Sequence, residues 1–254
     1  MPTRMKARTR HPSIRKLLIA GGFMGLLLGQ AAAVIADEVP PTTAGIVVAE
    51  PPTQLPTALL DRKFDVWIDD REVGAHSYRF TGEPEDFRVV SQASFAMKIA
   101  FITVFSYEHK ATEQWRDGCL VALDSATETG DDFKVAGEAR PEGFSLETLG
   151  GGQTYDLGCA WGFAYWNPGM RDRPTLINAQ DGNLFEVEIK KIAPRPLSIG
   201  SGSVSAQAWA LTGEALDITL FYDDQDHWIG LDTVVAGGRI LRYRPAPDDP
   251  FYPG

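Results

Sequence analysis

Apolar and polar residues alternate along most of the chain, and this period of two restricts the fold more than any other feature. In FDVWID, Phe64, Val66 and Ile68 lie on one face of an extended segment, and the residues between them lie on the other. DDRE then forms a tight turn into VGAHSYRF, which predicts a β-hairpin. Similar segments recur as far as RILRYR, separated by turns such as GEPED and QDGN, and no stretch shows a sustained helical repeat. We therefore predict an all-β fold, an antiparallel meander forming a closed or incomplete β-barrel, with a sandwich as second choice.

The first 36 residues have the composition of a signal peptide. Six basic residues without an acidic one precede the apolar run LLIAGGFMGLLLGQAAAVIA. Val34 and Ala36 are small enough for cleavage before Asp37, while the run is also long enough for an uncleaved membrane anchor. Both interpretations export the rest of the chain, so we expect a periplasmic or secreted protein.

The distribution of proline divides the rest of the chain into a linker, a domain and a tail. Residues 37–61 hold five prolines and little hydrophobic periodicity, which predicts an extended linker. Residues 62–244 are enough for one β-rich domain with its own core. Residues 245–254, PAPDDPFYPG, are rich in proline, which keeps them out of a central strand, and we expect them to form a flexible tail.

The charge balance excludes two classes of partner. The chain has 24 basic and 34 acidic residues, and the leader holds six of the basic residues and none of the acidic ones, so the remainder is near −16. Phosphate backbones and anionic lipid surfaces repel such a body. We therefore expect no nucleic-acid partner and no membrane contact beyond the export segment.

Several stretches carry a resemblance to a known family. FDVWIDDREVGAHSYRF, FSYEHKATEQWRDGCLVALDSATE, LINAQDGNLFEVEI and LFYDDQDHWIGLD resemble the exported bacterial family called domain of unknown function 6134, and EQWRDGCL is the most specific piece. The resemblance implies a secreted or periplasmic β-rich domain with no established activity or cofactor. The opening hairpin with Gly74 is more distantly similar to incomplete β-barrel envelope proteins such as lipoprotein carriers, which implies a likeness of fold alone.

Common catalytic and cofactor motifs are missing from the sequence. It has no zinc-protease, dithiol, serine-hydrolase or phosphate-loop signature. His76, His109 and His227 fall on different predicted strands or strand edges, and nothing in their spacing makes them converge. We therefore predict no metal site and no cofactor, and an enzyme is less favoured than a non-enzymatic protein.

One predicted strand places ionisable and aromatic side chains on the same face. Tyr107, His109, Glu113 and Trp115 share parity there. If that face is internal, Glu113 becomes a half-buried carboxylate beside His109, and such a carboxylate could act as an acid or base. A hydrogen-bonded pair that fixes strand register is the alternative, and it is the role that we expect.

The segment LGCAWGFAYWNPG concentrates aromatic residues beside a cysteine. Read as a strand, it places Cys159, Trp161, Phe163 and Tyr165 on one face and small residues with Trp166 on the other. A bulky row of this kind fills a barrel interior or lines a cavity for an apolar guest. The candidate ligand-binding residues are Trp161, Phe163, Tyr165, Tyr107, His109, Glu113 and Trp115.

The chain has two cysteines, and the leader directs it to an oxidising compartment. An even number of cysteines there favours a disulfide, so we predict that Cys119 pairs with Cys159, 40 positions later. Two separate buried thiols are the alternative.

Three function classes follow. The first is a non-enzymatic carrier or binding module for an apolar or lipid-like guest. The second is a structural or interaction protein of the cell envelope with a filled core. The third is a hydrolase-type enzyme that uses His109 and Glu113. A guest site should leave several hundred cubic ångströms unfilled, whereas a structural domain should not.

Overall fold

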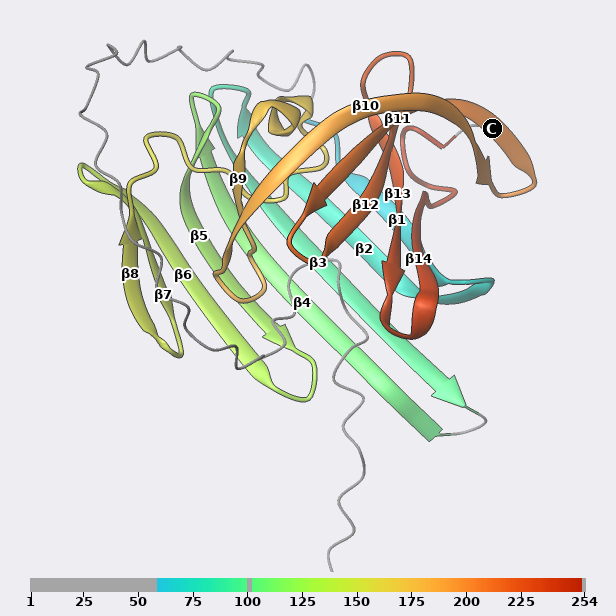
Figure 1. Cartoon of the computed structure of the whole chain (residues 1–254), viewed down its shortest axis with the longest axis horizontal. Coiled ribbons are helices and arrows are strands. Elements are labelled where there is room, and N and C mark those ends of the chain that lie inside the picture. Colours follow the sequence, from blue (N-terminus) through green and yellow to red (C-terminus); the bar gives the residue numbers. More distant parts are fainter. Residues whose placement is uncertain (1–58, 100–101, 253–254) are drawn as a thin grey trace, which may run out of the picture.

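The computed structural model describes residues 59–99 and 102–252, most of them in one β-sheet (Figure 1). The expected signal peptide, residues 1–36, and most of the expected linker, residues 37–61, lie outside the described residues. The described residues include no helix long and apolar enough to cross a membrane.

Within the described residues the sheet has 14 strands, and neighbouring strands are antiparallel throughout. The strands are β1 (Arg62–Ile68), β2 (Arg71–Glu83), β3 (Asp86–Ile99), β4 (Ile102–Arg116), β5 (Cys119–Glu128), β6 (Asp132–Arg140), β7 (Gly143–Thr148), β8 (Gly151–Tyr155), β9 (Thr175–Ile177), β10 (Leu184–Ile199), β11 (Gly202–Gly213), β12 (Leu216–Tyr222), β13 (Trp228–Val235) and β14 (Arg239–Pro245). Two short 3-10 helices are η1 (Pro168–Asp172) and η2 (Ala236–Gly238).

The strand order explains why the sheet remains open. Strands that follow each other in the chain are neighbours in the sheet, except that β1 pairs with β14 and that β8 and β9 form its two ends. The sheet is therefore not closed into a barrel. The prediction of an all-β antiparallel meander is confirmed, in its incomplete-barrel form.

The β9 end of the sheet curls back onto its concave face. The turn 178–183 between β9 and β10 reaches β5, where the Ser125 hydroxyl donates to the Ala179 carbonyl oxygen. Thr127 Oγ1 donates to the Gln180 carbonyl oxygen at 3.2 Å. Figure 1 shows β10 arching across the curved sheet. The concave face thereby becomes an interior.

The connection between β8 and β9 runs through this interior. We call residues 156–174 the inner segment. The segment was expected to contain a strand with one bulky face, and that expectation is wrong. It is irregular, with isolated bridges from Ala160 to Leu120 and from Gly162 to Ile177, and then η1.

Both parities of the inner segment are buried because protein surrounds it on more than one side. Trp161 and Tyr165 of one parity are buried, and so is Trp166 of the other. Trp166 makes edge-on ring contacts with Phe87 at 5.7 Å and with Trp115 at 5.4 Å. The segment therefore fills much of the barrel-like interior with aromatic side chains.

A disulfide fastens the inner segment to the sheet, as predicted. Cys119 at the start of β5 is bonded to Cys159, with Cα atoms 5.1 Å apart. Beside it, the Leu120 amide donates to the Ala160 carbonyl oxygen at 2.9 Å. The covalent bond and the adjacent hydrogen bond fix the entry of the inner segment.

The C-terminal residues were expected to form a flexible tail, but up to Tyr252 they are packed against the domain. Asp249 is buried, and Arg62 Nε lies 3.0 Å from its Oδ2. Phe251 lies under the same guanidinium group and packs against a second small apolar cluster. Proline prevents this segment from forming a strand, but the buried ion pair anchors it to β1.

Candidate functional site

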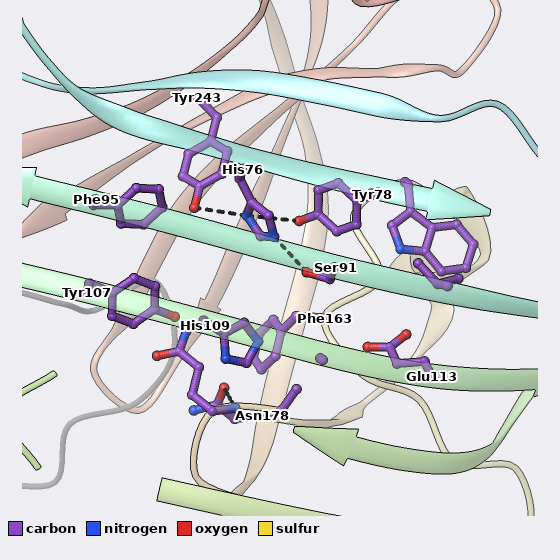
Figure 2. A pocket seen from close by; sticks show the side chains of 15 residues that line it. His76, Tyr78, Ser91, Phe95, Tyr107, His109, Glu113, Phe163, Asn178 and Tyr243 are labelled. Carbon is purple, nitrogen blue, oxygen red and sulfur yellow. Dashed lines mark hydrogen bonds between the residues drawn. The ribbon is translucent and has the colours of Figure 1, made fainter. Parts of the chain in front are cut away.

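A cavity of about 80 Å³ lies on the concave face of the sheet (Figure 2). Strands β2, β3, β4 and β14 form its walls, and the inner segment and the turn 178–183 contribute further lining residues. Its polar lining side chains belong to His76, Tyr78, Ser91, Tyr107, His109, Glu113, Asn178, Gln180 and Tyr243.

Strand register brings these side chains to one face. His76 on β2 pairs with Ala93 on β3, which pairs with His109 on β4. Tyr78, Ser91 and Ala111 form the next such row. Because side chains two residues apart share a face of a strand, the rows stack into one continuous wall.

His76 is held by hydroxyl groups on two sides. Its Nε2 lies 2.7 Å from Ser91 Oγ, and its Nδ1 lies 3.2 Å from the Tyr243 hydroxyl and 3.4 Å from the Tyr78 hydroxyl. Figure 2 shows the imidazole between the two tyrosines. Burial, and to a smaller extent His109, lowers the pKa of His76 to about 3, so its ring is neutral near pH 7.

His109 is oriented by a hydrogen-bond chain. Thr127 Oγ1 donates its single hydrogen to the Gln180 carbonyl oxygen, so it accepts from His109 Nδ1, which lies 2.8 Å away. In the neutral ring, Nε2 is then an acceptor. Burial lowers the pKa of His109 to about 4, which keeps the ring neutral near pH 7.

Glu113 is the one acidic residue in the cavity lining. Its Oε2 accepts a hydrogen bond from Trp115 Nε1 at 2.8 Å. Burial raises the pKa of the carboxyl group to about 7, and the Trp115 hydrogen bond only partly opposes this rise. Near neutral pH this side chain therefore changes between an acid and a carboxylate.

The expected hydrogen-bonded pair of His109 and Glu113 does not form. Both side chains lie on the cavity face, but residues four apart on a strand are about 13 Å apart along it. Each has its own partner, Thr127 for His109 and Trp115 for Glu113. The shared face was thus predicted correctly, whereas direct contact was not.

The predicted ligand-binding residues separate into two groups. Tyr107, His109, Glu113 and Phe163 line the cavity. Trp115, Trp161 and Tyr165 are instead buried in the aromatic core around it. Trp161 Nε1 lies 3.3 Å from Cys159 Sγ, and Tyr165 packs against Trp228 with ring centroids 5.4 Å apart.

Sequence reasoning missed several lining residues. His76 and Tyr78 share parity in VGAHSYRF, and this pattern could have placed both on the internal face. Asn178 had no such signal, since it arrives through the fold-back of the turn 178–183. Among the described residues, no group of three or more His, Cys, Asp or Glu side chains is arranged to hold a metal ion.

Comparison with known proteins agrees with the fold. A family model described as "Domain of unknown function (DUF6134)" matches residues 64–246. A solved structure, the "Beta-barrel-like Protein of Domain of Unknown Function DUF1849 from Brucella abortus", is similar with a TM-score of 0.52 and 9% sequence identity. The similarity covers 73% of this chain and 94% of that one, and at this identity it shows a shared fold alone. No curated protein matches the sequence.

Proposed function

The chain belongs to the DUF6134 family, and we propose that it is an exported binding protein that holds a small polar molecule in the cavity. The family description gives no activity, so the argument depends on the site. The aromatic interior around the cavity is tightly filled, and yet polar side chains from four strands converge on a space that remains open.

The chemistry of the walls is the observation that carries this proposal. Burying hydroxyl, imidazole and carboxyl groups costs free energy, and the hydrogen bonds that they form with one another and with neighbouring side chains recover this cost only in part. Apolar side chains at these positions would fill the interior without that cost. A ligand that uses the polar groups gives a reason for keeping them.

The size of the cavity limits the ligand. An apolar cavity of about 150 Å³ holds benzene, so one of about 80 Å³ suits a molecule of only a few non-hydrogen atoms. Its volume and polar lining favour such a ligand over the apolar or lipid-like guest suggested by the aromatic segment.

A structural or interaction protein of the cell envelope is the second candidate. Two observations favour it. The cavity of about 80 Å³ is smaller than the several hundred cubic ångströms expected of a site for a larger guest, and the aromatic side chains of the inner segment, whose start is fixed by a disulfide, fill the concave face. An enzyme has less support. Ser91 and His76 have the spacing of a nucleophile and a base, but an imidazole with a pKa of about 3 is a weak base near pH 7.

Export is part of the proposal. The disulfide between Cys119 and Cys159 supports an oxidising compartment, as the composition of residues 1–36 also does. Fractionation of cells that produce the chain tests this part, and recovery in the cytoplasm with two free thiols would contradict it.

The binding proposal is tested by filling the cavity. Ala111 is a small buried lining residue on β4, so Ala111→Leu occupies the space, whereas Lys110→Leu introduces the same side chain at the exposed neighbouring position. A thermal-shift screen with small polar compounds should find ligands that stabilise the unsubstituted protein and Lys110→Leu, but not Ala111→Leu. Compounds that stabilise all three equally, or a screen without any ligand, would favour the structural candidate.

A further inference from the structure

The cavity has an unbalanced charge composition. Its lining contains one carboxyl group, that of Glu113, and neither lysine nor arginine. In Figure 2, Glu113 and Tyr107 lie at opposite ends of the part of β4 that lines the cavity. A site for an anionic ligand normally supplies basic side chains or exposed backbone amides, so this lining disfavours an anion.

The histidines do not change this balance at neutral pH. Burial keeps the pKa of His76 at about 3 and that of His109 at about 4, so both rings are uncharged. His109 instead presents an acceptor nitrogen, because its Nδ1 donates to Thr127. Tyrosine hydroxyls of the lining also have acceptor oxygens.

Aromatic rings form much of the remaining wall. Phe163 and Trp166 line the cavity from the inner segment, whose Gly162 lies beside Glu113, and Phe95 and Tyr107 are stacked at the other end with ring centroids 5.1 Å apart. The face of an aromatic ring attracts a positive charge, and the attraction is stronger where water is excluded. Rings, neutral acceptors and one carboxylate together complement a cation with a small carbon skeleton.

We propose that the cavity binds a small organic ammonium ion, with its nitrogen against Glu113 and its carbon atoms against the aromatic rings of the inner segment, which passes close to Glu113 at Gly162. The inference rests on the proposed function, since it names the ligand class of the same cavity. Such an ion supplies the opposite charge that a buried carboxylate lacks. The formal net charge of −10 also attracts cations to the molecule as a whole.

The experiment compares ligands of similar size and different charge. Ethanolamine is a cation at pH 8, ethylene glycol is its neutral counterpart, and glycolate is a small anion. Binding to the purified chain is measured by tryptophan fluorescence, since Trp166 lines the cavity, and by ligand-observed NMR. Ethanolamine should bind at least about tenfold more tightly than either of the other two.

Two variants locate the contact. Glu113→Gln keeps an acceptor for Trp115 Nε1 and removes the charge, so it should weaken ethanolamine binding by about tenfold or more. Glu108→Gln removes one charge from the exposed face of the same strand and should change binding by less than about twofold. Thermal unfolding of each variant confirms that it is folded, and the ligand comparison on the unsubstituted protein stands independently of both.

The outcomes separate this inference from the proposed function. Equal or tighter binding of ethylene glycol or glycolate overturns the ammonium assignment and leaves a binding protein. The same conclusion follows if none of the three probes binds but the compound screen finds a ligand that Ala111→Leu abolishes. If neither experiment finds a ligand, both proposals are wrong.

Discussion

At the scale of single residues, Glu113 is the side chain whose behaviour depends most on its surroundings. The same carboxyl group on an open strand would be ionised at neutral pH. Inside the cavity it has a pKa of about 7 and a single hydrogen bond, from Trp115. Its protonation is therefore linked to the stability of the fold.

The first prediction concerns this linkage. The raised pKa of Glu113 means that the folded protein retains a proton that the unfolded chain releases between about pH 4.5 and 7. The contribution of Glu113 to the free energy of unfolding therefore falls as the pH rises through this window, by up to about 3 kcal/mol. Glu113→Gln lacks this contribution, so its stability relative to the unsubstituted protein should increase between pH 5 and pH 8.

Urea unfolding at several pH values measures this difference. His76 and His109, whose lowered pKa values reduce stability as the pH falls below about 6.5, are present in both proteins and largely cancel in the comparison. Glu108→Gln is the control, because Glu108 is exposed on the same strand. A stability difference that is independent of pH would show that Glu113 ionises normally in the folded state.

At the scale of elements, strands were predictable and the inner segment was not. Alternation in FDVWID and VGAHSYRF identifies β1 and β2, because one face of each meets the interior. The inner segment has a similar alternation of large and small residues, but Gly162 and Pro168 lie in an irregular path that is enclosed by other elements. The alternation of residues within a segment does not indicate whether other elements surround that segment on all sides.

The site was predictable to the same extent. Parity along β4 identifies Tyr107, His109 and Glu113 as neighbours on one face, and all three line the cavity. Asn178 and Phe163 reach it through long-range packing, which has no period in the sequence. The distances between side chains likewise depend on how neighbouring strands are aligned.

The second prediction concerns the disulfide as an anchor of the inner segment. The bond closes a loop of 40 residues, and the loss of unfolded-state entropy in such a loop stabilises the fold by up to about 4 kcal/mol. The double variant Cys119→Ser, Cys159→Ser should therefore unfold at a lower urea concentration. Because Trp161 Nε1 contacts Cys159 Sγ, the near-ultraviolet circular dichroism of its indole should also change.

A reducing agent provides the control for this experiment. It should lower the stability of the unsubstituted protein toward that of the double variant and leave the variant unchanged. Equal stability of the oxidised protein and the double variant would mean that packing alone holds the inner segment.

At the scale of the whole molecule, one pairing differs from the rest. The other strand pairs join strands that follow each other in the chain. The consecutive strands β8 and β9 do not pair, because they form the two ends of the sheet and the inner segment connects them. Only β1 and β14 pair across the full length of the domain, with Phe64 opposite Pro245. The anchored residues up to Tyr252 extend this contact, through Arg62 and Asp249.

Because β1 pairs with β14, the order of the strands in the sheet is the order in the chain after circular permutation, with β9 first and β8 last. A circular permutant that begins at Leu157 and joins Tyr252 to Leu59 by a short Gly-Ser linker would run from β9 to β14 and then from β1 to β8. Every strand pair would then be local along the chain, which favours faster folding, whereas the inner segment with Cys159 would become more distant from β5 with Cys119. We expect this permutant to form the same disulfide and to refold several-fold faster in stopped-flow fluorescence. Refolding at an unchanged or slower rate would show that closing β1 onto β14 does not limit the folding of the natural order.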